Sequence, residues 1–214
     1  MEHSFVLASR SPRRRELLGL IVPADRISIV PPRDAAEAGF DGLSTTAAIE
    51  RRLAEIARAK AEDVADQLGG ATGAQARVII AADTTVVVGA TDGALCVLGQ
   101  PPETEAWRDT VRRWFREHYA GRTHRALTAL CVIGPTGRRV ERIASTAVTI
   151  VADVEKYLAW YLATEEPRGK AGGYAIQGAA SVFVSQVTGS LSNVIGLPLE
   201  ALLDAFEELQ VVFE

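Results

Sequence analysis

The sequence predicts a mixed α/β fold in a single domain that spans residues 1–214. Two segments carry this prediction: apolar side chains recur at helical spacing between residues 44 and 68, and residues 78–88 form a β-branched run typical of a strand. Further helical and strand-like segments alternate along the chain without a strict βαβ repeat. A chain of 214 residues can bury a full core, and no linker is long enough to separate two independent domains.

The N-terminal half begins with a short buried strand at residues 5–8, followed by a helix. Ser11 is suited to cap this helix and Pro12 to occupy its first position, because that position needs no amide hydrogen. We expect a second strand at 26–30, a loop at 31–43, a helix at 44–68 and a turn at 69–76. Residues 78–88 then form one central strand or a strand pair.

The C-terminal half is expected to continue in the same way. A charged helix at 103–119 precedes two strands at 127–133 and 143–151, which the turn 134–137 joins. Asp153 is expected to cap a helix that ends near residue 164. A glycine-studded loop at 171–178, a strand at 181–187 and a last helix from Pro198 complete the series.

Composition narrows the classes of function and the cellular location. The net charge of −4 gives no electrostatic footprint for DNA or RNA, so we expect no nucleic-acid partner. Cys96 and Cys131 have neither the spacing of a zinc site nor that of a disulfide framework. The apolar run at the N-terminus is too short for a signal peptide, and no segment approaches the roughly 20 apolar residues of a membrane span. We therefore expect a cytoplasmic protein without a membrane partner, for which a homodimer is one candidate assembly.

Three consecutive arginines, Arg13 to Arg15, follow the Ser11-Pro12 helix start. Cations oppose the helix dipole in the first turn, whereas a bound anion would relieve that conflict. Free N–H groups and guanidinium forks at a helix start together can cradle a phosphate. A solvated basic face is the alternative interpretation.

A second polar feature interrupts the β-branched run, where Ala81-Ala82 precede Asp83-Thr84-Thr85. Burial of an unpaired carboxylate costs several kcal/mol, so Asp83 needs a partner. A metal ion or an attacking water would supply one, with Asp83 as ligand or general base. The alternative is an aspartate bonded to nearby backbone at a strand end.

Two further features are weaker when taken alone. Lys60 interrupts the apolar stripe of the helix at 44–68 and either extends to solvent or reaches into a cleft. The glycine loop that begins at Lys170 allows close backbone approach, and its Gln177 offers an amide that could recognise a base edge. No Walker motif occurs, and His124 is expected to be structural.

These features occur together, and in this order, in the Maf-like nucleotide pyrophosphatases, once described as septum-formation inhibitors. The sequence resembles this family over nearly its whole length. Matching segments are residues 7–14, 57–61, 82–84, 121–124, 166–167, 170–172, 174–178 and 196–199. The resemblance implies an elongated central sheet with two lobes around a cleft, similar to the fold of inosine triphosphate pyrophosphatases.

The resemblance also implies an activity and a set of site residues. Family members hydrolyse the bond between the α and β phosphates of a nucleoside triphosphate with a divalent cation, Mg²⁺ or Mn²⁺. By this resemblance Asp83 is the proton acceptor and a metal ligand, and Lys60 is a phosphate-contacting cation. Ser11, Arg14, Gln100 and Lys170 are expected to contact substrate. Arg13, Thr84 and Gln177 match the branch of the family that acts on dTTP and UTP.

The chain departs from the family pattern at three places. Gln100 stands where a lysine is usual, and Gly169 where an aspartate is common. The expected Asp-Glu pair after the second strand is missing, which leaves Glu37 as the nearest candidate metal ligand. An alternative hypothesis is therefore a catalytically weakened nucleotide-binding protein with a regulatory role linked to cell division. A purine-directed pyrophosphatase is a third hypothesis, which Thr84 and Gln177 oppose.

Overall fold

The computed structural model describes residues 3–33, 39–69, 77–89 and 93–213. Seven strands within these residues form one mixed sheet in the order β2-β1-β3-β5-β6-β7, with β4 paired to β3 outside this path. Their bounds are β1 Ser4–Leu7, β2 Ile27–Ile29, β3 Arg77–Gly89, β4 Leu95–Leu98, β5 Thr123–Ile133, β6 Arg139–Ile150 and β7 Val184–Thr188. The pairs β1–β2 and β1–β3 are parallel, and the other pairs are antiparallel. The predicted mixed α/β class is confirmed.

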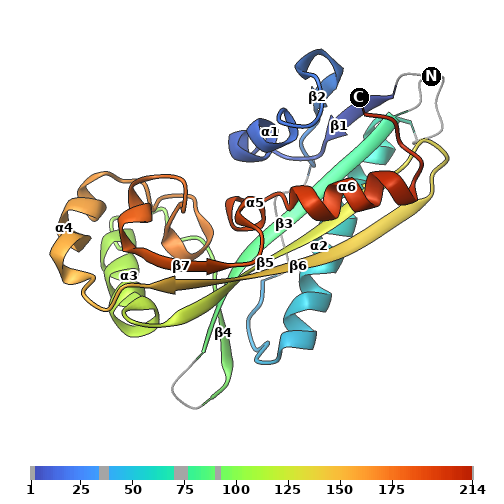
Figure 1. Ribbon diagram of the computed structural model, residues 1–214. Coiled ribbons are helices and arrows are strands. Elements are labelled where there is room, and N and C mark those ends of the chain that lie inside the picture. The colour runs from blue at the N-terminus through green and yellow to red at the C-terminus, as the bar shows by residue number, and fades with distance from the viewer. Residues whose placement is uncertain (1–2, 34–38, 70–76, 90–92, 214) are drawn as a thin grey trace.

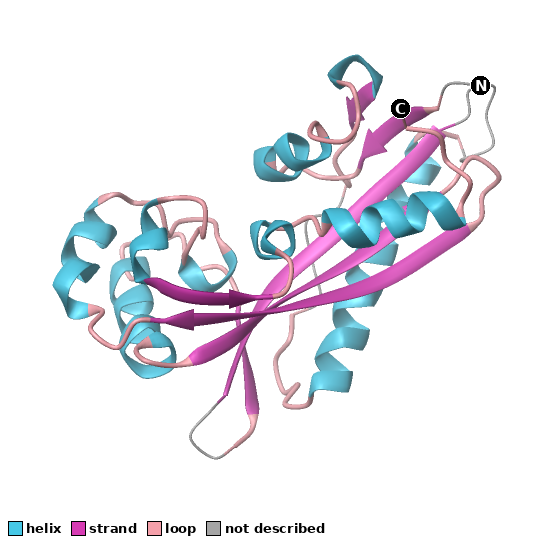
Figure 2. Cartoon of the chain, viewed as in Figure 1, coloured by secondary structure: helices cyan, strands magenta, loops and turns pink. Residues whose placement is uncertain are grey.

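Helices cover the sheet unevenly (Figures 1 and 2). The helix α2 lies along one side of the long strands β3 and β5, and α1 and α6 lie on the other side. A separate group around α3 and α4 gathers at the far end of the sheet, beside β7. The bounds are α1 Pro12–Leu18, α2 Thr46–Gln67, α3 Trp107–Trp114, α4 Glu155–Ala163, α5 Leu191–Ile195 and α6 Leu199–Glu208. Short turns of helix are η1 Ala24–Arg26, η2 Phe115–Tyr119, η3 Ala171–Gly173 and η4 Ala179–Phe183.

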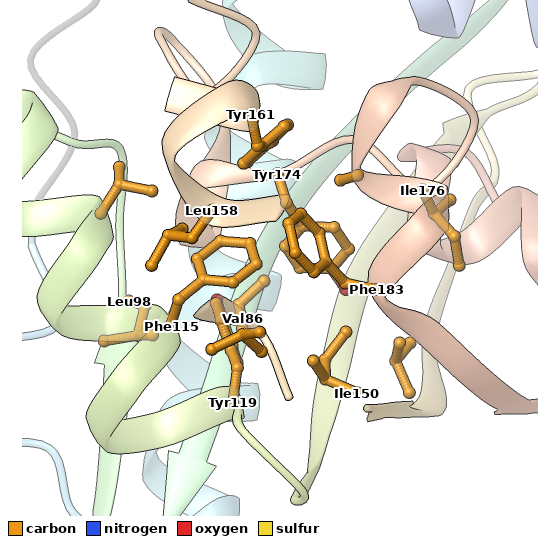
Figure 3. Close-up of a cluster of buried hydrophobic side chains, with 14 of the residues drawn as sticks. Val86, Leu98, Phe115, Tyr119, Ile150, Leu158, Tyr161, Tyr174, Ile176 and Phe183 are labelled. Atoms are coloured by element: carbon orange, nitrogen blue, oxygen red, sulfur yellow. The ribbon is translucent and has the colours of Figure 1, made fainter. Parts of the chain in front are cut away.

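Side-chain alternation along β3 divides the core into three parts. Residues Ile79, Ala81 and Val87 pack under α2, whereas Val78, Ile80 and Ala82 pack under α1 and α6 on the opposite face. Further along that second face, Val86 and Val88 belong to the core of the far lobe, which Figure 3 shows around Phe115 and Phe183. On the second face, the segment of β3 between these two cores contains Thr84. This segment lies between the two lobes.

One edge of β3 is shared by two strands that do not meet. β1 pairs with Arg77 to Ile80, and β4 pairs with Val86 to Gly89. The carboxyl ends of β1 and β4 therefore approach the same five residues, 81–85, from opposite directions. Strand β5 pairs with the other edge of this stretch. The topology leaves residues 81–85 uncovered at one edge, and the loops that leave β1 and β4 flank them.

The structure confirms most predicted elements and corrects several. Ser11 caps α1 and Pro12 is its first residue, as predicted. Asp153 does not cap the next predicted helix: α4 begins at Glu155 with Val154 at the N-cap position and no capping side chain. Residues 181–183 belong to a 3-10 helix rather than to the last strand, β5 begins at Thr123, and β4 and α5 were not predicted.

The termini and the helix lengths complete the description. Both chain ends lie at the same end of the elongated sheet (Figure 1). No helix in the described part of the chain is both long and apolar enough to cross a membrane.

Candidate active site

A pocket of about 840 Å³ opens at the uncovered edge of β3, between the two lobes. Its walls contain every predicted site residue that the structure describes: Ser11, Arg13, Arg14, Lys60, Asp83, Thr84, Gln100, Lys170 and Gln177. Glu37 lies outside the described residues, so its predicted role as a metal ligand stays a prediction. The structure thus brings together residues from α1, α2, β3, the end of β4 and the glycine loop.

Helix α1 delivers its arginines to this pocket from the loop after β1. The Ser11 hydroxyl accepts a hydrogen bond from the backbone N–H of Arg14 at 3.4 Å and fixes the helix start. The Arg14 guanidinium donates to the carbonyl of Gly196 at 2.8 Å and to the Thr84 hydroxyl at 3.2 Å. These bonds tie α1 to β3 and to the segment after α5, so Arg14 has a fixed position, and Arg13 beside it also lines the pocket.

Asp83 and Lys60 form a close ion pair at the pocket wall. Lys60 lies on α2, on the face of β3 to which Asp83 points, and its Nζ is 2.6 Å from Asp83 Oδ1. The side chains are only 15% and 11% exposed, so water screens this pair far less than a surface salt bridge. Lys60 therefore reaches into a cleft and does not extend to solvent, which decides between the two sequence-based alternatives.

A hydrogen-bond chain crosses the sheet from Arg14 through two facing threonines. Thr84 and Thr128 are paired across β3 and β5, and their hydroxyl oxygens are 2.9 Å apart. Thr128 donates to the carbonyl of Asn193 at 3.1 Å, so it accepts from Thr84. The Thr84 hydroxyl thus accepts a hydrogen bond from Arg14 and donates one to Thr128, so its proton is already donated to a protein group.

The glycine loop forms the opposite wall, and two buried tyrosines hold it. The Tyr119 hydroxyl donates to the carbonyl of Gly172 at 2.8 Å, and the Tyr161 hydroxyl donates to the carbonyl of Gly173 at 3.1 Å. Gly172 has φ +70°, and a Cβ there would lie 2.5 Å from the Tyr119 oxygen. Only glycine allows this approach. Because the turn is fixed in this way, the neighbouring Lys170 has a defined place in the pocket.

Positive charge predominates in the pocket. Arg10, Arg13, Arg14, Lys60 and Lys170 line it, against the carboxylates of Asp83 and Glu103. Burial and the nearby positive charge of Arg13 lower the pKa of Lys170 from its ordinary value, although Glu166 acts in the opposite direction. Two cations that repel each other across a pocket are stabilised when a polyanion binds between them. The electrostatics therefore favour a ligand with several phosphates.

Comparison with known proteins assigns the chain to a family. The model of the Maf-like protein family matches residues 4–209. The chain belongs to the Maf-like family. A relative from Brucella abortus (strain 2308), named dTTP/UTP pyrophosphatase, is 37% identical over 94% of this chain and 88% of its own length. A relative of the same name from Pyrococcus horikoshii is 36% identical over 93% of both chains. The solved structure of a HAM1 protein from Coxiella burnetii aligns with a TM-score of 0.44 at 16% identity, over 72% of this chain and 75% of that one.

The two departures from the Maf-like pattern that the structure describes both lie at the pocket. Gln100 follows β4 and is exposed to the pocket, so it places a neutral amide among the cations. Gly169 also lines the pocket, with φ +65°. A side chain at that φ is strained, although a Cβ would meet no atom within 4 Å. The glycine therefore suits the backbone turn that precedes Lys170.

His124 has the structural role that its sequence context favours. It is buried, and its Nε2 lies 2.7 Å from the Tyr174 hydroxyl. Burial lowers the pKa of His124 to about 4, so the imidazole is neutral near pH 7. His124 does not line the pocket, but it fixes Tyr174, which does.

Sequence analysis missed the polar residues that support this Maf-like site from behind. Asn193 is fully buried, and its Nδ2 donates to the carbonyl of Ala126 at 3.0 Å and to the Thr146 hydroxyl at 2.9 Å. It holds α5 against the sheet and so places the Gly196 carbonyl that Arg14 contacts. The sequence feature that could have indicated α5 is Ser190, which caps this helix and accepts a hydrogen bond from the Asn193 backbone N–H at 3.1 Å.

The fit of a divalent cation depends on the carboxylates of the pocket. The described residues contain no group of three or more His, Cys, Asp or Glu side chains that could hold a metal ion. Mg²⁺, however, commonly binds through one or two carboxylates together with water and the phosphates of its substrate. Asp83 and Glu103 supply carboxylates in this pocket. The donor set therefore fits a cation that enters with the triphosphate better than one held by the protein alone.

Proposed function

We propose that this protein is a nucleotide pyrophosphatase that hydrolyses dTTP and UTP to the nucleoside monophosphate and pyrophosphate. The observation that carries the proposal is the Lys60–Asp83 ion pair, 2.6 Å apart, in the wall of a pocket lined by further cations. Relatives at 36–37% identity over at least 93% of this chain are named dTTP/UTP pyrophosphatase, which supports the same activity.

The reaction adds one water molecule across the anhydride bond between the α and β phosphates. Asp83 is the group placed to accept a proton from that water, because its carboxylate lines the pocket in the stretch of β3 that neither β1 nor β4 pairs with. The Lys60 ammonium orients the carboxylate and lies where it can stabilise charge on a phosphate oxygen. Arg13, Arg14 and Lys170 bind the triphosphate and orient it for attack.

A divalent cation, Mg²⁺ or Mn²⁺, belongs to this proposal as the cofactor. Asp83 is the residue that would hold it, with Glu37 as the second ligand expected from the sequence. Such an ion supplies neutralisation of the phosphate charge. The residues of the chain supply the position of the phosphates and the proton acceptor.

Base selection in this proposal involves Arg13, Thr84 and Gln177, which match the pyrimidine branch of the family. Gln177 lines the pocket and is exposed, so its amide is available to a base edge. Thr84 contributes differently, because its hydroxyl proton is donated inside the protein and its oxygen holds Arg14. We therefore propose that Thr84 acts on the substrate mainly through the position of Arg14.

The test is a comparison of natural nucleoside triphosphates with Mg²⁺ and with Mn²⁺, with detection of pyrophosphate and orthophosphate separately. We expect pyrophosphate from dTTP and UTP at a higher kcat/KM than from ATP or GTP. Orthophosphate as the main product, or a preference for purines above tenfold, would contradict the proposal.

A second candidate function is a weakened nucleotide-binding protein that acts in regulation linked to cell division. The specific observation in its favour is Gln100, a neutral amide at the pocket where a family lysine would add charge. Nucleotide binding at micromolar concentration without turnover of any triphosphate would support this alternative over the enzyme.

We infer that the protein acts in the cytoplasm, since Cys96 and Cys131 are both unpaired, as a reducing compartment favours. Its partner in this proposal is the nucleotide substrate, and the net charge of −4 argues against a nucleic-acid partner. Self-association into a homodimer remains a prediction, which sedimentation would test.

A further inference from the structure

Glu166 lies behind the pocket wall and outside the pocket lining, yet it contacts both ends of the loop that carries Lys170 and Gln177. Its carboxylate accepts hydrogen bonds from the backbone N–H groups of Ala179 at 2.7 Å and Ala180 at 3.1 Å. Its backbone carbonyl accepts a hydrogen bond from Lys170 Nζ. Glu166 thus links the segment before Lys170 to the segment just after Gln177.

The carboxylate completes the start of a short helix. Ala179 begins η4, and the first N–H groups of a helix have no partner within it. Glu166 supplies that partner from a distant turn and brings negative charge to the helix start. Gln177 is only two residues before Ala179, so the contact sets where the Gln177 backbone enters the pocket.

The neighbouring residues are adapted to this contact. A Cβ on Gly178 would lie 2.0 Å from Glu166 Oε2 and 2.7 Å from its Cδ, so a glycine is required beside the carboxylate. The backbone N–H of Glu166 donates to the Thr164 hydroxyl at 3.2 Å, and Glu165 has φ +56°, which reverses the chain after α4. A left-handed conformation is uncommon for a non-glycine residue, and here it occurs directly before Glu166.

A buried tyrosine lies between this contact and the glycine turn. Burial and the negative charge of Glu166 raise the pKa of Tyr161 above its ordinary value, which reflects how near the phenol and the carboxylate are. The Tyr161 hydroxyl donates to the Gly173 carbonyl at 3.1 Å. Figure 3 shows Tyr161 beside Tyr174 at the edge of this core. The loop is therefore fixed at its middle and at both ends.

We propose that Glu166 is a positioning residue for nucleobase selection. It sets the place of Gln177 through the backbone of residues 178–180 and does not contact the nucleotide itself. This inference rests on the proposed pyrimidine triphosphate pyrophosphatase activity. It adds Glu166, which does not line the pocket but fixes the loop that carries Gln177, to the residues of the proposed site.

The variant Glu166→Gln tests this role with little change in shape. Each carboxylate oxygen accepts from one N–H, and the amide of Glu166→Gln would put an NH₂ group, which is a donor, against one of these two N–H groups. A shift of about 1 Å at a substrate-positioning residue can cost up to about 100-fold in rate. We expect the ratio of kcat/KM for UTP to that for GTP to fall about tenfold, with a rise in KM for UTP that exceeds the fall in kcat.

Three further variants sharpen the test. Glu165→Gln removes the same charge one residue away, where the carboxylate pairs with Arg108 and Arg168 at the surface, and it should leave the ratio unchanged. Glu166→Asp keeps two accepting oxygens on a shorter side chain and should recover part of the selectivity. Gly178→Ala displaces the carboxylate from the other side and should lower the ratio as Glu166→Gln does.

The ratio of two substrates does not depend on the fraction of folded enzyme, so partial loss of stability does not mask the result. A wild-type protein that selects pyrimidines and a Glu166→Gln variant with the same ratio would overturn this inference while leaving the proposed function intact. A wild-type protein that hydrolyses no nucleoside triphosphate would overturn the proposed function, and this inference with it.

Discussion

Replacement of Asp83 by asparagine separates the catalytic role of this carboxylate from its structural role. The introduced amide would keep an accepting oxygen near Lys60 Nζ, now 2.6 Å from Asp83 Oδ1, but it would carry no negative charge. The bond from the Lys60 ammonium would still involve one charge, so it would keep part of the roughly 1.5–3 kcal/mol of a hydrogen bond to a charged group while the attraction between opposite charges is lost. The lysine would also lose the Asp83 counter-charge in a site where it is only 15% exposed. We expect the free energy of unfolding to fall by about 1–3 kcal/mol.

That loss is small beside the stability of an ordinary domain, which is about 5–15 kcal/mol, so the variant should stay folded. Loss of a general base typically lowers the rate about 100- to 10,000-fold, which corresponds to about 3–5 kcal/mol in the barrier. We therefore expect kcat for UTP to fall by this factor while nucleotide binding remains detectable. The two effects can be separated because one appears in the free energy of unfolding and the other in kcat.

The assay has three parts: pyrophosphate release at saturating UTP, calorimetric binding of UTP, and urea unfolding of each variant. Asp153→Asn is the matched control, since it removes an exposed carboxylate outside the pocket. An Asp83→Asn variant that keeps more than half of the parent kcat would show that another group accepts the proton.

Three further predictions concern the pocket and its supports. Gln100→Lys should raise kcat/KM about fivefold, because an ammonium adds to the phosphate contact a charge attraction that a neutral amide lacks, worth about 1 kcal/mol. An unchanged value in a folded variant would refute a missing-charge defect. Burial lowers the pKa of His124 to about 4 in the folded protein, against 6.5 in the unfolded chain, so the unfolded state binds more protons between these values. The free energy of unfolding should therefore fall as the pH drops from about 6.5 towards 4. Unfolding measured across that window should show a weaker pH dependence in His124→Gln. Gly172→Ala should lower the free energy of unfolding by about 3 kcal/mol, since its Cβ would clash with Tyr119. Gly169 has a similar φ but open space around it, so Gly169→Ala should cost about 1–2 kcal/mol. Equal losses in the two variants would contradict the steric argument.

Sequence reasoning succeeds here where the signal is local. The Ser11-Pro12 helix start depends on two adjacent residues, and the structure has it as predicted. Asp83, Lys60 and Gln177 were identified because charged or amide side chains stand out against apolar or glycine-rich surroundings, whereas Gln100 came from the family resemblance. The Lys60–Asp83 contact could not be inferred, because it depends on how α2 packs on the face of β3.

The features that were missed depend on tertiary contacts. β4 is four residues long, and its assignment rests on pairing with β3. Asn193 resembles a surface residue in sequence, and only its bonds to Ala126 and Thr146 explain why a polar side chain is fully buried. Glu166 belongs to a matched segment, but its partners are backbone groups more than ten residues away, which no spacing rule reveals.

The two walls of the pocket are joined by continuous strands, and this limits how the protein can move. β3, β5 and β6 run from one lobe into the other (Figure 1), and β5 and β6 are paired along eleven consecutive residues of β5. A change in the width of the pocket must therefore bend several hydrogen-bonded strands together. Such deformation is spread over many residues, each moving slightly. Nucleotide should therefore enter a gap whose width is largely set before binding, and selectivity should come from the fixed shape of its walls.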